Sequence, residues 1–211
     1  KTGTNKLLNK MGNTKTNIIE GSADILEYGI DFFTDNEVVK DFPVLGTIVK
    51  IGFTAKSISD KIFLKKIERF LISYQEINDV KKNELIVKID LNKKERKRIG
   101  EALILLIDRI SDLEKPYYIA RCFSAYLNRK INFENFIALG NAIDLSHSLD
   151  LKQFLIDSEN ESNLDKLIRT GFAETSKKAI MMPQHGLSSV ILNTKITDLG
   201  RIFLDTCQEN Q

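Results

Sequence analysis

The sequence has few of the residues that build metal sites and disulfides. Its 211 residues include two cysteines, two histidines and no tryptophan. Cys122 and Cys207 are far apart in the sequence and belong to no CxxC motif, so we expect free thiols in a reducing compartment, not a disulfide framework. His147 and His185 are too few for a histidine-based metal site. We predict no metal and no cofactor.

Catalytic motifs are also missing. The sequence has no HExxH, GxSxG or P-loop pattern. Ser146 precedes His147, but a neighbouring Ser-His pair is not a catalytic triad. Cys122 lies in an apolar helical pattern, which is typical of a small core residue and not of a nucleophile. We therefore predict that the chain is not an enzyme and that it has no small-molecule substrate.

No hydrophobic run is long enough to cross a membrane, because a span needs roughly 18 apolar residues. The best candidate, residues 42–55 (FPVLGTIVKIGFTA), is shorter and contains Lys50. We interpret it as a buried segment, with a membrane-active segment as the alternative. In that alternative the membrane-contacting residues are Phe42, Val44, Leu45, Ile48, Val49, Ile51 and Phe53. No secretory signal pattern is found, and we expect a cytoplasmic protein.

Neither sign of charge dominates. The chain has 31 Lys and Arg against 29 Asp and Glu, a net charge of +2. Any binding to nucleic acid or anionic lipid must therefore come from a local patch. The strongest local patch is Lys93, Lys94, Arg96, Lys97 and Arg98. It is either a phosphate-binding or acidic-partner surface, or a solvated helical turn in which Glu95 and Glu101 form surface pairs.

Apolar residues recur with helical spacing through most of the chain. Hydrophobic residues make up 42% of the sequence, enough for a core. Residues 63–74 carry one apolar stripe with a period of 3.6 residues, and a second stripe runs from Ile99 to Leu113. Residues 17–33 also show a helical pattern. The sequence predicts a mainly α fold, a bundle of six to eight helices with the 63–74 and 99–113 helices at its centre.

Helix-start signals divide the rest of the chain. Pro116 is suited to a first helical turn, and Asn132, Ser148, Ser162 and Thr197 are predicted N-caps. We predict a flexible lead-in over residues 1–16, a helical domain over 17–157, and a tail over 162–211 that packs against the helical domain or hangs from it. The Asn- and Ser-rich residues 158–163 are the candidate hinge.

The tail has a different pattern from the helical domain. A short helix ends at Gly171, two short strands follow near 172–174 and 190–192, and a final helix starts after Thr197. This order resembles the end of bacterial winged-helix domains. The matching residues are Leu167, Gly171, Phe172, Ile196, Thr197, Leu199, Gly200 and Phe203.

The winged-helix resemblance implies a small α+β element and a possible DNA contact. The cations that would meet phosphates are Lys166, Arg169, Lys177, Lys178 and Lys195. Alternatively, the wing packs only against the helical body or a partner, since Asp165, Glu174 and Asp198 dilute the positive charge.

The middle of the chain resembles uncharacterised bacterial helical proteins. The similar segments are FPVLGTIVK, SISDKIFLKKIERFL and YLNRKINFENF. The resemblance implies a bacterial origin and no named activity, although some proteins of this layout are suspected to act in phage defence.

Together these observations favour a non-catalytic interaction or regulatory protein of the bacterial cytoplasm. Its expected partner is another protein or a second copy of itself. The alternatives are a DNA-associated winged-helix regulator that binds nucleic acid, and a membrane-active or phage-defence effector that uses residues 42–55 at a membrane surface.

Overall fold

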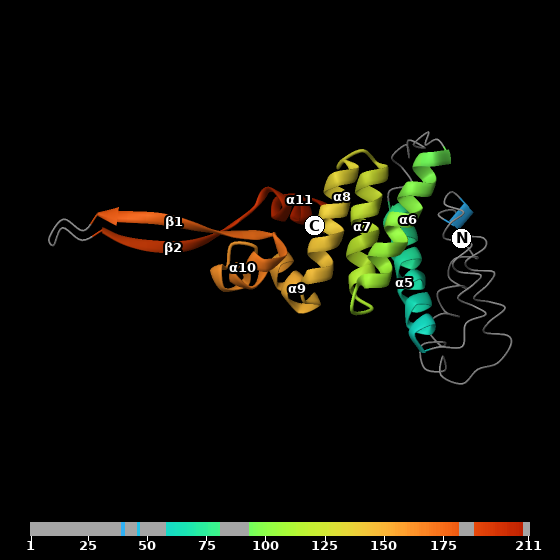
Figure 1. Cartoon of the computed structure of the whole chain (residues 1–211), viewed down its shortest axis with the longest axis horizontal. Helices are drawn as coiled ribbons and strands as arrows, with labels where there is room; N and C mark the ends of the chain where they lie inside the picture. The colour runs from blue at the N-terminus through green and yellow to red at the C-terminus, as the bar shows by residue number, and fades with distance from the viewer. Residues whose placement is uncertain (1–38, 41–45, 47–57, 81–92, 182–187, 209–211) are drawn as a thin grey trace.

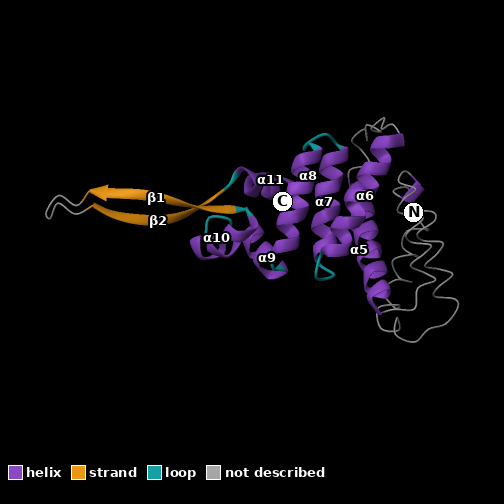
Figure 2. Cartoon of the chain, in the orientation of Figure 1, coloured by secondary structure: helices purple, strands orange, loops and turns teal. Residues whose placement is uncertain are grey.

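The computed structural model describes residues 39–40, 46, 58–80, 93–181 and 188–208. Within these ranges the chain is mainly helical, with seven helices, one short 3₁₀ turn and one two-stranded antiparallel sheet (Figures 1 and 2). The mainly α prediction is therefore confirmed. The helices are α5 (Ile58–Val80), α6 (Lys93–Arg109), α7 (Lys115–Leu127), α8 (Phe133–Leu145), α9 (Ser148–Ile156), α10 (Glu161–Leu167) and α11 (Asp198–Cys207).

The core of the helical body forms where the apolar stripes of α5 to α8 meet. Leu103, Leu106 and Ile110 are almost completely buried, as the spacing of the central stripe predicts. The stripe nevertheless ends earlier than expected. Helix α6 stops at Arg109, and Leu113 lies beyond it with 40% of its surface exposed. The prediction of a helix through residue 113 is therefore wrong.

Three of the predicted helix-start signals are found as expected. Pro116 lies in the first turn of α7. The side chain of Asn132 accepts a hydrogen bond from the Asn135 amide at 2.7 Å and caps α8. The hydroxyl of Thr197 accepts one from the Gly200 amide at 3.1 Å and caps α11.

Two predicted caps are wrong. The N-cap position of α9 is His147, because Ser148 is already helical and its hydroxyl donates to the Asp112 carboxylate at 2.5 Å. The cap of α10 is Asn160, whose side chain accepts a hydrogen bond from the amide of Ser162. In the first case the Asp112 carboxylate binds the hydroxyl of the predicted cap, Ser148. In the second case Asn160, two residues before Ser162, occupies the cap position.

Two buried lysines satisfy carbonyl groups at helix ends. Lys115 is 2% exposed, and its ammonium donates to the Asp144 carbonyl and to the Ser111 hydroxyl, both at 2.9 Å. Lys66 donates to the Asp108 carbonyl at 2.8 Å near the end of α6. The last carbonyls of a helix have no partner within the helix, so these lysines act as C-terminal caps.

Hydrogen bonds at one backbone turn join the segment before the first strand of the tail to the start of α11. After α10 the 3₁₀ turn η1 (Ile168–Thr170) ends at Gly171, which has a φ of +86° and supplies the left-handed conformation expected of it. The Thr197 amide donates to the Phe172 carbonyl at 3.0 Å, and the Thr197 hydroxyl donates to the Gly171 carbonyl at 2.6 Å. The start of α11 is thereby fixed to the residues that precede the first strand.

The tail also shares a core with the helical body. Phe154, Phe172 and Phe203 are fully buried and pack as an aromatic cluster, with ring centroids 4.7 to 6.0 Å apart. Tyr118 of α7 adds a fourth ring, 5.8 Å from Phe203. Arg121 of α7 donates to the Thr206 carbonyl of α11 at 3.1 Å. Apolar packing therefore continues from α7 through α9 into α11.

The strands are longer than the sequence predicts. They are β1 (Ala173–Met181) and β2 (Ser188–Ile196), paired antiparallel from Ala173 opposite Ile196 to Met181 opposite Ser188. Only the base of this hairpin packs against α10, η1 and α11. Beyond the base the two strands project away from the helices (Figure 1).

Candidate anion-binding surface

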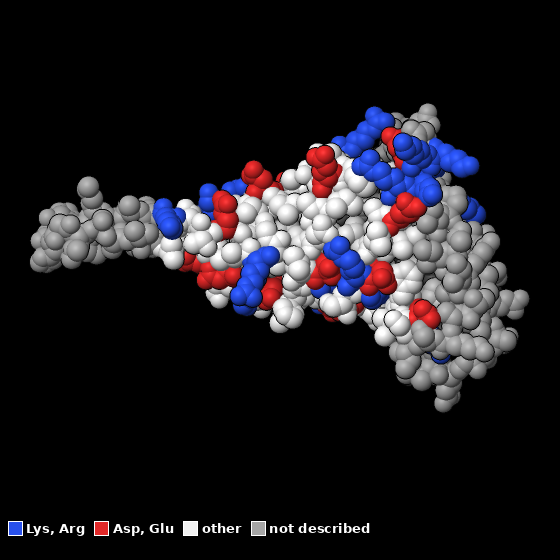
Figure 3. All heavy atoms as spheres, viewed as in Figure 1, with Lys and Arg blue, Asp and Glu red and all other residues white. Residues whose placement is uncertain are grey.

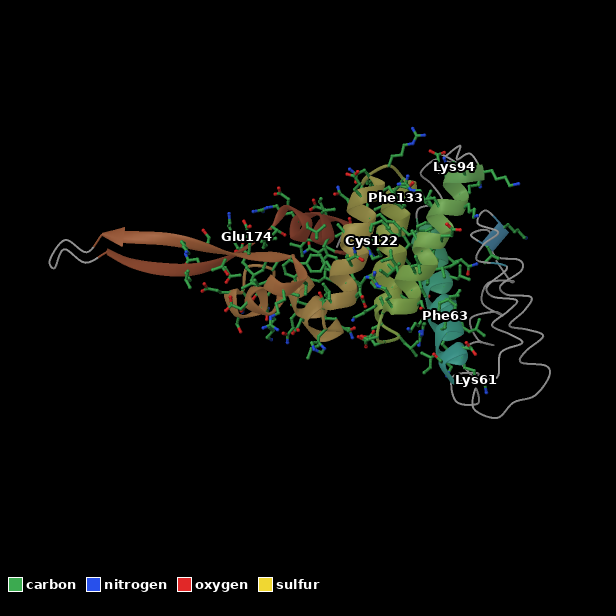
Figure 4. The ribbon with its side chains drawn as sticks, viewed as in Figure 1. Lys61, Phe63, Lys94, Cys122, Phe133 and Glu174 are labelled. Carbon is green, nitrogen blue, oxygen red and sulfur yellow. The ribbon has the colours of Figure 1, made fainter. Side chains whose placement is uncertain are left out.

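A stacking contact joins two segments that are distant in the sequence. Arg98, in the second turn of α6, places its guanidinium 4.1 Å from the centroid of the Phe133 ring at the start of α8. Phe133 in turn packs edge-on against Tyr126 near the end of α7, at 5.8 Å. Arginine over an aromatic face is a favourable cation–π arrangement. The start of α6 therefore lies beside the α7–α8 turn, and Figure 4 shows Lys94 and Phe133 at this same end.

Seven cations gather at this end of the molecule, which we call the basic end. They are Lys93, Lys94, Arg96, Lys97 and Arg98 from α6 and Arg129 and Lys130 from the α7–α8 turn. All are exposed except Arg96, which is half-buried. Figure 3 shows a concentration of Lys and Arg side chains over the start of α6.

The turn geometry holds Arg129 and Lys130 next to the helices. The amide of Arg129 donates to the Tyr126 carbonyl and that of Lys130 to the Ala125 carbonyl, both at 2.9 Å. Arg129 has a φ of +57°, a conformation that few residues other than glycine adopt. The backbone therefore turns tightly at this point and keeps both cations at the basic end.

Acidic residues offset only part of this charge. Lys97 pairs with Glu101 at 3.7 Å, one helical turn away, and Glu95 and Glu134 are the other carboxylates of these segments. Within the described residues, no ion pair involves Lys93, Lys94, Arg129 or Lys130. The basic end thus has an excess of positive charge, although the whole chain is close to neutral.

Burial and charge at the basic end also shift the pKa of the Tyr126 hydroxyl. Burial raises the pKa of its hydroxyl, the Glu95 carboxylate raises it further, and the Arg98 guanidinium opposes this shift. Tyr126 therefore remains a neutral hydroxyl at physiological pH. It is the polar neighbour of the Arg98–Phe133 stack and adds no negative charge.

The basic end is suited to bind a multiply charged anion. The first amides of a helix lack partners within the helix and carry partial positive charge. Cations in the first turn of α6 increase this positive potential, which costs a few tenths of a kcal/mol per residue in the absence of an anion. A phosphate group would interact favourably with both the amides and the side chains.

Of the five tail cations predicted to contact DNA, two form ion pairs. Lys166 pairs with Asp150 at 3.7 Å and donates to Gln153, and Lys195 pairs with Glu174 at 2.9 Å. Arg169 and Lys177 are exposed. The side chain of Lys178 lies outside the described part of the chain.

Helix α10 is also closely held by its neighbours. It has seven residues, and Asp165 accepts a hydrogen bond from the Thr194 hydroxyl of β2. Glu161 accepts one from the Thr194 amide at 3.4 Å. Two of its carboxylates therefore face the hairpin, and Lys166 is turned toward α9.

Other predicted features lie partly or wholly outside the described residues. The seven candidate membrane-contacting residues between 42 and 53 are among those outside, as is the expected 17–33 helix. In the part that is described, no helix is both long and apolar enough to span a bilayer. No cluster of His, Cys, Asp and Glu there could hold a metal ion. Cys122 and Cys207 are buried, free thiols, and the prediction that Cys122 is a core residue is confirmed.

Five of the seven cations of the basic end form a cluster that the sequence alone indicates. Arg129 and Lys130 are not indicated, because they form only a pair in sequence and lie about 30 positions after the α6 run. The available signal was the polar NRK segment between the apolar patterns of α7 and α8. It indicates an exposed turn, but it does not show which helix end the turn approaches.

Comparisons with protein-family models, with curated proteins and with solved structures give no match. The fold and the basic end define a helical protein with a β-hairpin arm and a cationic surface at the opposite end of the described structure (Figures 1 and 3).

Proposed function

We propose that this chain is a non-catalytic interaction protein of the bacterial cytoplasm whose basic end binds the phosphate backbone of nucleic acid. The observation that carries the proposal is the gathering of seven cations from α6 and the α7–α8 turn, held together by the Arg98–Phe133 stack. Backbone binding needs clustered cations and no base-reading element. The function is therefore attachment to nucleic acid without strong sequence preference.

A phosphate backbone suits this surface better than an acidic protein segment does. The cations come from a helix start and an adjoining turn, so they are distributed over an end of the molecule and not along one groove. A regularly charged polymer can contact such a surface in many registers.

The tail is a weaker candidate for the same role. The order of α10, Gly171, hairpin and α11 supports a winged-helix-like shape, with Gly171 in the left-handed conformation that this turn requires. The ion pairs of Lys166 and Lys195 leave that region with little excess charge. We propose that the winged-helix-like element has a structural role and is not the principal nucleic-acid surface.

Two charge-reversal variants distinguish these surfaces. The first carries Lys94→Glu and Lys130→Glu at the basic end, and its matched control carries Arg169→Glu and Lys177→Glu in the tail. Each lowers the net charge by the same amount, and all four side chains are exposed. Circular dichroism and thermal unfolding of both variants check that the fold is retained.

Binding is measured by fluorescence anisotropy with a labelled duplex of mixed sequence at about 50 mM salt, where backbone contacts are strong. We expect the basic-end variant to bind at least about tenfold more weakly than wild type, and the tail variant to stay within about threefold. Loss of binding only in the tail variant contradicts the proposal and supports the DNA-associated winged-helix alternative. A wild-type chain that does not bind the duplex also contradicts it.

A further inference from the structure

The two strands of the hairpin arm differ in charge. Strand β1 carries Lys177 and Lys178, whereas β2 has no charged residue from Ser188 to Thr194. Natural proteins commonly place lysines on exposed edge strands, because unpaired backbone groups can otherwise pair with another strand. Strand β1 has this protection, and the outer part of β2 lacks it.

Two hydrogen bonds establish which backbone groups of β2 face its free edge. The Thr197 amide donates to the Phe172 carbonyl, so this pair bonds across the hairpin. The Thr194 amide instead donates to Glu161 of α10, outside the hairpin. Since antiparallel residues alternate between the two patterns, the amides and carbonyls of residues 188, 190 and 192 also point away from β1.

Helix α10 covers only the base of this edge. It contacts β2 through Thr194, with bonds to Glu161 and Asp165. Farther out the arm projects from the helices (Figure 1), and Leu192 is 59% exposed. An isolated two-stranded hairpin is only marginally stable in water, and three or more strands are normally needed. The outer edge of β2, Ser188–Leu192, is therefore the part of the arm that another strand would stabilise.

We propose that this edge pairs antiparallel with the same edge of a second copy of the chain, with Val190 opposite Val190 of the partner subunit. An outward-facing residue on a two-fold axis forms a reciprocal pair of hydrogen bonds with its own copy. The result is a four-stranded sheet in the order β1-β2-β2-β1. This inference concerns the arm alone and does not rest on nucleic-acid binding at the basic end.

Charge favours a second copy through β2 and disfavours one through β1. Antiparallel pairing centred on Val190 places Ser188 opposite Leu192 of the partner subunit, and no charged residue lies in the paired segment. The corresponding pairing through β1, centred on Ala179, would put Lys177 and Lys178 of both copies in the paired segment. A register centred on Lys177 would set like charges directly opposite one another, which destabilises a sheet. The β2 edge meets its own copy without these charges.

The first test is the mass of the full chain in solution, measured by light scattering across a range of concentrations. We expect the 24.0 kDa chain to form a dimer as the concentration rises. Val190→Lys puts a charge at the centre of the pairing edge and should leave a monomer. Thr175→Lys, the matched control on the other strand, should still form a dimer. A wild-type monomer at every concentration, or dimerisation of Val190→Lys equal to wild type, overturns the proposal.

The second test is disulfide trapping, which does not depend on how well Val190→Lys folds. Opposed residues of a hydrogen-bonded pair have Cα atoms about 5.5 Å apart, within the range that a disulfide spans. Cys122 and Cys207 are buried and do not compete. Val190→Cys should give a cross-linked dimer under mild oxidation much faster than Thr175→Cys. Equal rates for the two variants, or no cross-link with Val190→Cys, overturn the proposed pairing.

Discussion

Replacing Gly200 by alanine tests whether the start of α11 lies as close to the hairpin base as the structure shows. A Cβ atom at this position would lie 2.2 Å from the Phe172 carbonyl oxygen and 2.7 Å from Cγ2 of Ile196. The first distance is roughly 1 Å or more short of van der Waals contact. The carbonyl cannot rotate away, because it also accepts the hydrogen bond from the Thr197 amide.

Two opposing effects determine the sign of the change. Within a helix, alanine is favoured over glycine by about 1 kcal/mol. Overpacking against a fixed backbone costs about 1–3 kcal/mol, and the upper end applies here because the obstructing atom is backbone. Disturbing the Thr197–Phe172 hydrogen bond costs about 1 kcal/mol more. We expect a net loss of about 2–3 kcal/mol in the free energy of unfolding.

Urea denaturation followed by circular dichroism measures this loss. With a slope of about 2 kcal/mol per molar urea, the midpoint of Gly200→Ala should fall by about 1 M. Two control variants should each lower the midpoint by less. Arg201→Ala changes an exposed residue of the same helix and should shift the midpoint little. In Gly140→Ala the three atoms nearest to the new Cβ all belong to the Leu106 side chain and none to backbone, so this variant should cost less. An unchanged or higher midpoint for Gly200→Ala would refute the close approach.

Three further predictions concern buried polar groups. Burial raises the pKa of Tyr118 to about 12. The free energy of unfolding should therefore fall as the pH rises from 10 to 12. In urea titrations, Tyr118→Phe should lose this part of the pH dependence. Cys122 and Cys207 are both buried, so both thiols should react with a disulfide reagent only after unfolding. Burial, with Cys122 beside it, also raises the pKa of the Cys207 thiol. Rapid labelling of the native chain contradicts the packing of α11 on α7. Lys115→Met leaves the Asp144 carbonyl without its donor and should lower stability by about 1–3 kcal/mol, whereas an unchanged melting temperature contradicts the role of the lysine as a cap.

The sequence predicted the helices of the body because their apolar residues repeat with a period that only a helix places on one face. Leu103, Leu106 and Ile110 lie inside for this reason. The error at Leu113 arose because the pattern continues past Arg109 while the chain leaves the helix. Asp112 accepts hydrogen bonds from the Glu114 and Lys115 amides and starts the next helix instead.

Local signals predicted the tail less completely. Gly171 and Thr197 act through their own backbone and side-chain preferences, so their roles could be predicted from the sequence. Ser148 failed as a cap because its hydroxyl bonds to Asp112, a residue 36 positions earlier. Such a partner depends on how α9 packs against the α6–α7 connection, which the local sequence does not determine.

One part of the basic end could be predicted from the local sequence, and the other part depends on how the helices pack. The α6 cations are adjacent in sequence, and their clustering was clear from the chain alone. Arg129 and Lys130 join them because α6 packs against α7 and α8, with Arg98 stacked on Phe133 beside the α7–α8 turn. The pairing of Lys166 and Lys195 with carboxylates was equally hidden, because Asp150 lies on a different helix and Glu174 on the opposite strand.

The salt dependence of duplex binding tests the role of the basic end most directly. Four of its cations, Lys93, Lys94, Arg129 and Lys130, have no ion pair within the described residues. Four phosphate contacts predict a slope of about −3.6 for the logarithm of the binding constant against the logarithm of salt concentration. The Lys94→Glu and Lys130→Glu variant should bring the slope to about −1.8 or shallower. A wild-type slope near zero, or the same slope in both proteins, contradicts the account.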